Sequence, residues 1–200
     1  MNRLNREERD SLFDADTLFN DLYPHSIREL SKLHWTPLEI SQKVARFLSQ
    51  ENDETILDIG SGVGKFCLAA AHYMPQSFYY GIEQRKSLIT HAENAKKILG
   101  LKNVDFIHGN FTQLDFRKFN HFYFYNSFYE NLQGTDKIDD SIEYSDELYI
   151  YYKRYLYRQL EQKPKGTRLC TLCTWDHEIP PEYHIVGADL ADRLKFWIKV

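Results

Sequence analysis

Several short groups of residues in this 200-residue chain have types and spacings that suit ligand chemistry. The first is Asp58-x-Gly60-x-Gly62-x-Gly64, which directly follows a short apolar run. Glycines allow a tight turn and let a ligand approach the backbone, because no Cβ stands in the way. Apolar residues recur at helical spacing over 63–74, so a strand, a glycine turn and a helix are expected in succession. Such a unit presents backbone N–H groups to a ligand.

Two common phosphate-binding patterns do not fit this turn. A Walker loop needs Gly-x-x-x-x-Gly-Lys-Ser/Thr, but Ile59 stands at the position of its first glycine and Phe66 follows Lys65. The dinucleotide fingerprint Gly-x-Gly-x-x-Gly also fails, because Lys65 takes the place of its last glycine. An acid about 20 residues further on, at the end of the next strand, is the position that grips ribose hydroxyls. Glu83 has this position.

A second group, Asn126-Ser127-Phe128-Tyr129, follows the strand that we expect at 122–126. Ligands of open α/β sheets gather at the carboxyl ends of the strands. Aromatic faces attract cations, so Phe128 and Tyr129 are able to wall a bound amine. Alternatively, Asn126 only caps the next helix.

The glycine pattern resembles motif I of the class I S-adenosylmethionine-dependent methyltransferases. The resemblance continues through Tyr80-Gly81-Ile82-Glu83, His108-Gly109-Asn110-Phe111 and Phe124-Tyr125-Asn126-Ser127-Phe128. Together these stretches extend the resemblance over residues 54–200. It implies a transferase that uses S-adenosyl-L-methionine as its cofactor and carries out methylation without a metal.

The resemblance also implies which residues bind the cofactor. Asp58 steadies the turn or the donor's ammonium group, and Glu83 takes the ribose hydroxyls. Asn110 is expected to bond the adenine amino group, while Phe111 supplies a backbone N–H and a ring wall. The family often has Asp where Asn110 stands, but Asn keeps a carbonyl acceptor; alternatively, Asn110 is only a turn residue. The full predicted set is Asp58, Gly60, Gly62, Gly64, Glu83, Asn110 and Phe111.

The group after the fourth strand indicates the acceptor. It is similar to the Asn/Asp-Pro-Pro-Tyr/Phe motif of amino-methyltransferases, but Ser127 and Phe128 replace both prolines, which argues against adenine methylation of DNA. It also resembles the Asn-Asn-Phe segment of the non-SET histone lysine methyltransferases. We therefore predict N-methylation of an amine such as a protein lysine, with Asn126, Phe128 and Tyr129 as the catalytic residues. A small-molecule methyltransferase and a catalytically silent S-adenosylmethionine-binding module are the alternatives.

Composition restricts the partners. The net charge is −4, and acids are frequent over 136–147, so a protein or small amine is expected as substrate and nucleic acid is not. No apolar run approaches the roughly 20 residues that cross a bilayer, and the first residues do not form a signal peptide. A cytoplasmic protein without membrane contact is therefore expected. The oligomeric state is not predicted.

Alternating strand and helix patterns predict an α/β fold, Rossmann-like by the resemblance, with a seven-stranded and mostly parallel sheet. Helices are expected at 63–74, 85–99 and 147–162, and a loop or lid at 129–143. The last two strands lack a helix between them and should form an antiparallel pair. The expected strands are 55–59, 78–83, 104–108, 122–126, 168–174, 183–187 and 195–200.

Residues 1–53 are expected to form a helical extension packed on the single domain of 54–200. One helix should run to residue 22, Ser26 should cap a second, and Thr36 should cap a third that has Pro37 at its first position. His34 and Trp35 either close over the donor or place a Trp in the core.

The three cysteines suit a reducing compartment. Cys170 and Cys173 fall within one predicted strand and should point to opposite faces, buried and without redox activity.

Overall fold

The structure is a computed structural model and describes residues 5–200. Its centre is a seven-stranded sheet with the strand order β3-β2-β1-β4-β5-β7-β6. Strands β1 to β5 are parallel, and β7 is antiparallel to both β5 and β6. The predicted fold class is therefore confirmed. The strands are β1 (Thr55–Ile59), β2 (Phe78–Glu83), β3 (Val104–His108), β4 (His121–Phe124), β5 (Arg168–Leu172), β6 (Tyr183–Asp189) and β7 (Leu194–Lys199).

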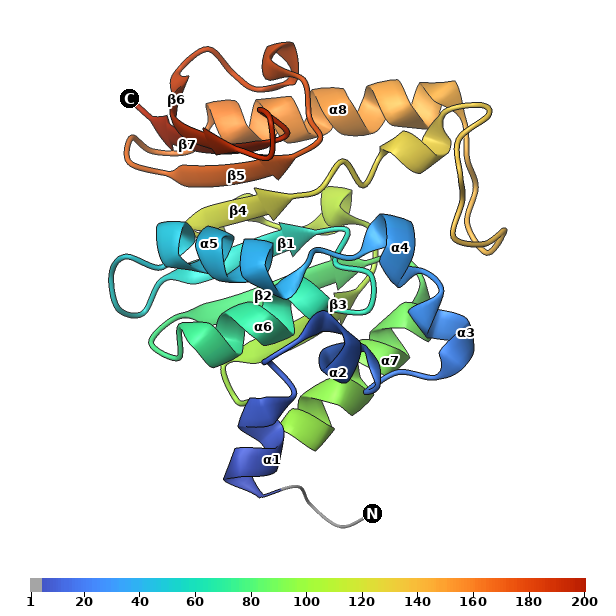
Figure 1. Cartoon of the computed structure of the whole chain (residues 1–200). Helices are drawn as coiled ribbons and strands as arrows, with labels where there is room; N and C mark the ends of the chain where they lie inside the picture. The colour runs from blue at the N-terminus through green and yellow to red at the C-terminus, as the bar shows by residue number, and fades with distance from the viewer. Residues whose placement is uncertain (1–4) are drawn as a thin grey trace.

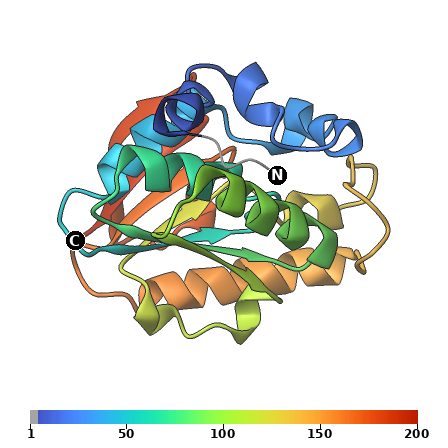
Figure 2. The same ribbon diagram turned by 90° about the horizontal axis from the view of Figure 1, so that it is seen from below.

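Helices cover both faces of the sheet and make three layers (Figure 1; Figure 2). One face carries α5 (Leu38–Leu48), α6 (Lys65–Tyr73) and α7 (Lys86–Leu99). The other face carries α8 (Asp146–Glu161) with the short turns η1 (Phe111–Gln113) and η2 (Phe116–Lys118). Because strand side chains alternate between faces, Ile56 packs in the hydrophobic core between the sheet and α5 to α7, and Leu57 packs in the core between the sheet and α8.

The order of the strands places the site. Strand β1 lies between β2 and β4: the chain runs outward from β1 through β2 to β3 and then returns to β4 on the other side of β1. In open α/β sheets ligands bind at this switch point. The later part of the N-terminal segment, residues 25–36, and the loop after β4 lie at this same end of the sheet (Figure 1; Figure 2).

Ahead of α5, the described part of the N-terminal extension, from residue 5, forms four short helices: α1 (Arg6–Ser11), α2 (Asp16–Asn20), α3 (His25–Arg28) and α4 (Ser31–His34). The prediction of one helix to residue 22 is wrong, because the chain breaks between α1 and α2. This break lets Phe13 stack on the His72 ring of α6 at 3.8 Å and lets Asp16 pair with Lys65. Tertiary contacts of this kind override local helix propensity.

Two predicted helix caps are also wrong. Pro24, not Ser26, is the N-cap of α3. Helix α5 begins at Leu38, and Asp16 of α2 accepts its first N–H at 3.0 Å. The Thr36 hydroxyl instead shares a 2.8 Å hydrogen bond with the hydroxyl of Tyr123 on β4.

The longest helix among residues 5–200 is α8, with 16 residues. No helix of that described part is long and apolar enough to span a membrane.

Candidate functional site

A cavity of about 450 Å³ opens at the carboxyl ends of β1, β2 and β4. Its floor is the glycine turn, and its walls include the N-terminal segment and the loop after β4. Gly64 and Asn110 are the predicted site residues that do not line it. Those that line it are Asp58, Gly60, Gly62, Glu83, Phe111, Asn126, Phe128 and Tyr129.

The three glycines of the turn have different surroundings, although each has a positive φ. A Cβ on Gly60 would collide with Ser127, and a Cβ on Gly64 would collide with Phe106. A Cβ on Gly62 would meet nothing within 4 Å. Gly60 and Gly64 are therefore required by packing, whereas Gly62 leaves backbone open to the cavity.

Glu83 stands at the end of β2 with its carboxylate held from two sides. Its Oε2 accepts the Gly62 N–H at 3.2 Å, and its Oε1 accepts the Arg85 N–H at 2.9 Å. Burial raises the pKa of Glu83, and the hydrogen bond and charge of Arg85 oppose this rise. The carboxylate is thus oriented at the cavity, as a ribose-binding acid requires.

Asp58 lies at the same floor and is almost fully buried. Burial raises the pKa of this carboxyl to about 7, although the Cys67 thiol donates to it at 3.5 Å. The charge of Glu83 adds to the rise. A cationic ligand group beside Asp58 would favour its ionised form.

Asn110 makes the turn that begins η1. Its Oδ1 accepts the Thr112 N–H at 3.0 Å, and its Nδ2 donates to Tyr152 at 2.7 Å and to Gln84 at 3.1 Å. A contact with adenine would require the side chain to exchange one of these partners. That role stays a prediction.

Asn126 follows β4 with φ +37, a left-handed conformation that non-glycine residues rarely adopt. Its carbonyl accepts the Tyr129 N–H at 3.0 Å. Within residues 5–200 no hydrogen bond engages its side-chain amide, which borders the cavity. Ser127 fixes this turn to β1 by donating to the Ile59 carbonyl at 2.5 Å. Strained residues of this kind concentrate at functional sites.

The two aromatic residues predicted as catalytic differ in exposure. Phe128 is 5% exposed and stacks on Phe111 at 4.9 Å, so it belongs to the wall that Phe111 forms. Tyr129 is 51% exposed at the cavity. Tyr129 is therefore the better placed of the two to meet an acceptor.

Sequence reasoning left open or missed several cavity residues. His34 and Trp35 both line the cavity, which favours the closing role over a purely core role. Lys65 and Arg85 also line it, each nearly buried and paired with carboxylates. A basic residue next to a predicted ligand-binding acid or turn is a signal that could have drawn attention to both.

The prediction for Cys173 is wrong. Strand β5 ends at Leu172, and Cys173 follows it with φ +58, exposed at the cavity. Cys170 is buried as expected. Both are free thiols.

Comparison with known families bears on residues 50–146, which match the family model described as a methyltransferase domain. Residues 50–146 form a class I methyltransferase domain. The predicted resemblance is confirmed, and with it S-adenosylmethionine as the cofactor at the level of the family.

Individual relatives of this methyltransferase domain match over shorter stretches. A tRNA (guanine-N(7)-)-methyltransferase of Microcystis aeruginosa is 43% identical over 54 residues, which is 27% of this chain and 26% of the relative. The chain thus spans about a quarter of that protein's length. The relative's name is at odds with our expectation that nucleic acid is not the substrate.

Solved structures share the fold. TrmN from Thermus thermophilus superposes with a TM-score of 0.61 at 17% identity, covering 87% of this chain and 52% of that one. An RNA methyltransferase from Salinibacter ruber, in complex with S-adenosyl-L-homocysteine, gives 0.53 at 20% identity, covering 82% and 93%. At these identities the likeness concerns the fold and leaves the acceptor open.

Proposed function

We propose that the chain is an S-adenosylmethionine-dependent N-methyltransferase whose acceptor is a cationic amine, such as a protein lysine. The observation that carries this proposal is Asn126, whose free amide stands at the cavity in a strained turn beside the exposed Tyr129. An amide oxygen can accept from an amine and orient its lone pair.

The donor would be held by the floor of the cavity. When bound, S-adenosylmethionine supplies an activated methyl group on a sulfonium. Glu83 would accept from ribose hydroxyls, the open backbone at Gly62 would border the donor, and Asp58 would face its ammonium group. In-line transfer needs no covalent enzyme nucleophile, so positioning is the main task of these residues.

A lysine acceptor must lose a proton before it has a lone pair. His34 lines the cavity and is half-buried. Burial lowers the pKa of His34, although the charge of Glu130 opposes this, so the ring is neutral at pH 7 and able to accept a proton. This assigns His34 the role of base.

The charge around the cavity favours a cation. The segment 129–147 contains one basic residue, Lys137. Two of its acids, Glu130 and Asp139, pair with Arg85. Asp136 lines the cavity, and within residues 5–200 it has no ion pair. The acids of this segment are Glu130, Asp136, Asp139, Asp140, Glu143, Asp146 and Glu147. Phosphodiester backbones are repelled by such a surface.

RNA is the second candidate acceptor, and the specific observation in its favour is the name of the matched relative. Guanine N7 carries a lone pair without losing a proton, so such a reaction would not need His34. Exposed rings such as Tyr129 and Trp175, which is 71% exposed, could stack on bases.

The deciding experiment is methyl transfer from radiolabelled S-adenosylmethionine to cell lysate, treated separately with protease and with nuclease. We expect label in protein bands that protease removes. Asn126→Gly should abolish transfer while S-adenosylhomocysteine binding survives, because glycine accepts the left-handed backbone but lacks the amide. Label that only nuclease removes would move the assignment to RNA, and absence of label would favour the silent module.

A further inference from the structure

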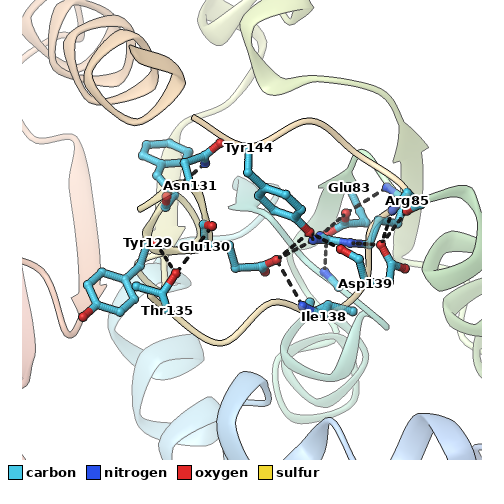
Figure 3. A network of polar contacts seen from close by, with 12 residues as sticks. Glu83, Arg85, Tyr129, Glu130, Asn131, Thr135, Ile138, Asp139 and Tyr144 are labelled. Atoms are coloured by element: carbon cyan, nitrogen blue, oxygen red, sulfur yellow. Dashed lines mark hydrogen bonds and ion pairs between the residues drawn. The ribbon is translucent and has the colours of Figure 1, made fainter. Parts of the chain in front are cut away.

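The residue that connects the donor site with the loop after β4 is Arg85, the N-cap of α7. Its backbone N–H and its Nη1 both donate to Glu83 Oε1, at 2.9 and 3.4 Å. The same guanidinium reaches the loop: Nε donates to Asp139 at 3.2 Å, and Nη2 donates to the Tyr144 hydroxyl at 2.7 Å and to Glu130 (Figure 3). The Arg85 side chain is 5% exposed.

The loop has few other attachments. None of the side chains of residues 132–145 is buried, and the segment contains neither helix nor strand. Ile138 makes partly buried apolar contacts, and its N–H donates to Glu130 at 3.4 Å. Tyr144 also donates to the Asp139 carbonyl at 2.5 Å, so the loop is folded on itself around the guanidinium. Burial of apolar surface therefore does little to hold it closed.

Charge makes Arg85 hard to replace. Three carboxylates, those of Glu83, Glu130 and Asp139, surround the one guanidinium. Without it they would repel one another and would lack their shared donor, because like charges at short range are unfavourable. The loop would then move away from Glu83. Glu83 would keep the backbone donors of Gly62 and of residue 85 but would lose the Nη1 donor at 3.4 Å.

We propose that Arg85 is a positioning residue that couples donor binding to closure of the loop 132–145. It acts through Glu83, whose carboxylate it turns toward the ribose site, and through Glu130, Asp139 and Tyr144, which it holds over the cavity. Ribose hydroxyls and a closed loop both favour the same orientation of the guanidinium. This inference rests on the proposed function only for the identity of the donor.

The test compares two ligands in the full-length protein: S-adenosylhomocysteine and its 2′,3′-dideoxyribose analogue, which lacks the hydroxyls that Glu83 would hold. For Arg85→Gln, calorimetry should show about tenfold weaker binding of S-adenosylhomocysteine, in the range of one charge-assisted hydrogen bond. The same variant should bind the dideoxy analogue within about twofold of wild type, because the interaction that Arg85 supports is absent. A merely structural role would weaken both ligands alike.

The loop side of the coupling has its own variant. Asp139→Asn removes an ion pair of Arg85 without touching Glu83, and should speed dissociation of S-adenosylhomocysteine about threefold in stopped flow. Arg117→Gln is the matched control: it breaks the exposed Arg117–Asp115 pair away from the cavity and should change neither affinity nor rate.

Two outcomes overturn the inference: equal losses for both ligands in Arg85→Gln, or unchanged S-adenosylhomocysteine binding in that variant. Failure of the wild type to bind S-adenosylhomocysteine would refute the donor assignment itself, and with it the coupling. A wild type that binds with the expected ligand dependence but transfers no methyl group would refute the proposed activity and leave the role of Arg85 standing.

Discussion

The N-terminal segment and the loop after β4 border the same cavity, but different interactions attach them to the sheet. The N-terminal segment is held by core packing: Phe19 is fully buried, and Tyr23 donates to the Val63 carbonyl at 3.1 Å. The loop 132–145 has no buried side chain and depends on Arg85.

A basic residue from a helix of the sheet layers pairs with each of the two: Lys65 of α6 with the N-terminal segment, and Arg85 at the start of α7 with the loop. Lys65 donates to Asp16 and, at 2.9 Å, to Asn20, and its Nζ lies 5.6 Å from the rings of Phe19 and Trp35. Burial lowers the pKa of Lys65, while Asp16 opposes this change. Aromatic packing surrounds this lysine, whereas the surroundings of Arg85 are polar (Figure 3). The N-terminal segment is therefore part of the hydrophobic core. The loop 132–145 is able to move away from the cavity at a small cost in free energy.

The largest expected effect is a difference in the free energy of unfolding between a substitution in the N-terminal segment and one in the loop 132–145. Phe19→Ala should lower the free energy of unfolding by about 3–5 kcal/mol, because it leaves a cavity in the core. Ile138→Ala in the loop should lower it by no more than about 1 kcal/mol, since that side chain is only partly buried. Urea titrations of both variants measure this, and equal losses would contradict the comparison.

A second substitution tests the glycine turn, which forms the floor of the cavity. Gly62→Val should weaken S-adenosylhomocysteine binding about a hundredfold, because the new side chain enters the cavity. Gly166→Val is the control: Gly166 also has a positive φ and open space around it, but lies outside the cavity. Both variants should lose similar stability from backbone strain, about 1–2 kcal/mol, while only the first loses affinity.

The pH dependence of donor binding sharpens the role of Asp58, whose pKa burial raises to about 7. If the donor's ammonium pairs with the ionised carboxylate, affinity should rise about tenfold from pH 6 to pH 8. Asp58→Asn should flatten this profile. The same shift has a stability consequence of opposite sign: because the unfolded carboxyl ionises near its ordinary pKa of 3.8, the free protein becomes less stable as pH rises from 4 to 7.

The smallest expected effect concerns opening of the loop. Trypsin should cleave native protein after Lys137 a few-fold faster than after Lys32, which lies in α4 of the N-terminal segment. Asp139→Asn should increase only the cleavage after Lys137. Faster cleavage after Lys32 than after Lys137 would show that the N-terminal segment, and not the loop 132–145, is the part that opens.

Most of the predicted site residues line one cavity, because the strand ends and the glycine turn that place them follow from local sequence patterns. Gly62 and Glu83 were both predicted to bind the cofactor, and a 3.2 Å hydrogen bond joins them. The predictions failed where the partner is distant in sequence: the break before Asp16 serves Lys65, which is 49 residues away. The residues next to Asp16 in the sequence do not predict its contact with Lys65.

The sequence by itself determined the strand, glycine turn and helix from Thr55 to Tyr73 and the alternation that makes the sheet parallel. These follow from backbone sterics and from apolar periodicity, which act over a few residues. Only the tertiary structure decided that the N-terminal segment is held by the core and that the loop 132–145 is held by Arg85. Arg85 finds Tyr144 across 59 positions and Lys65 finds Asp16 across 49, and such pairings depend on how the packed layers bring distant segments together.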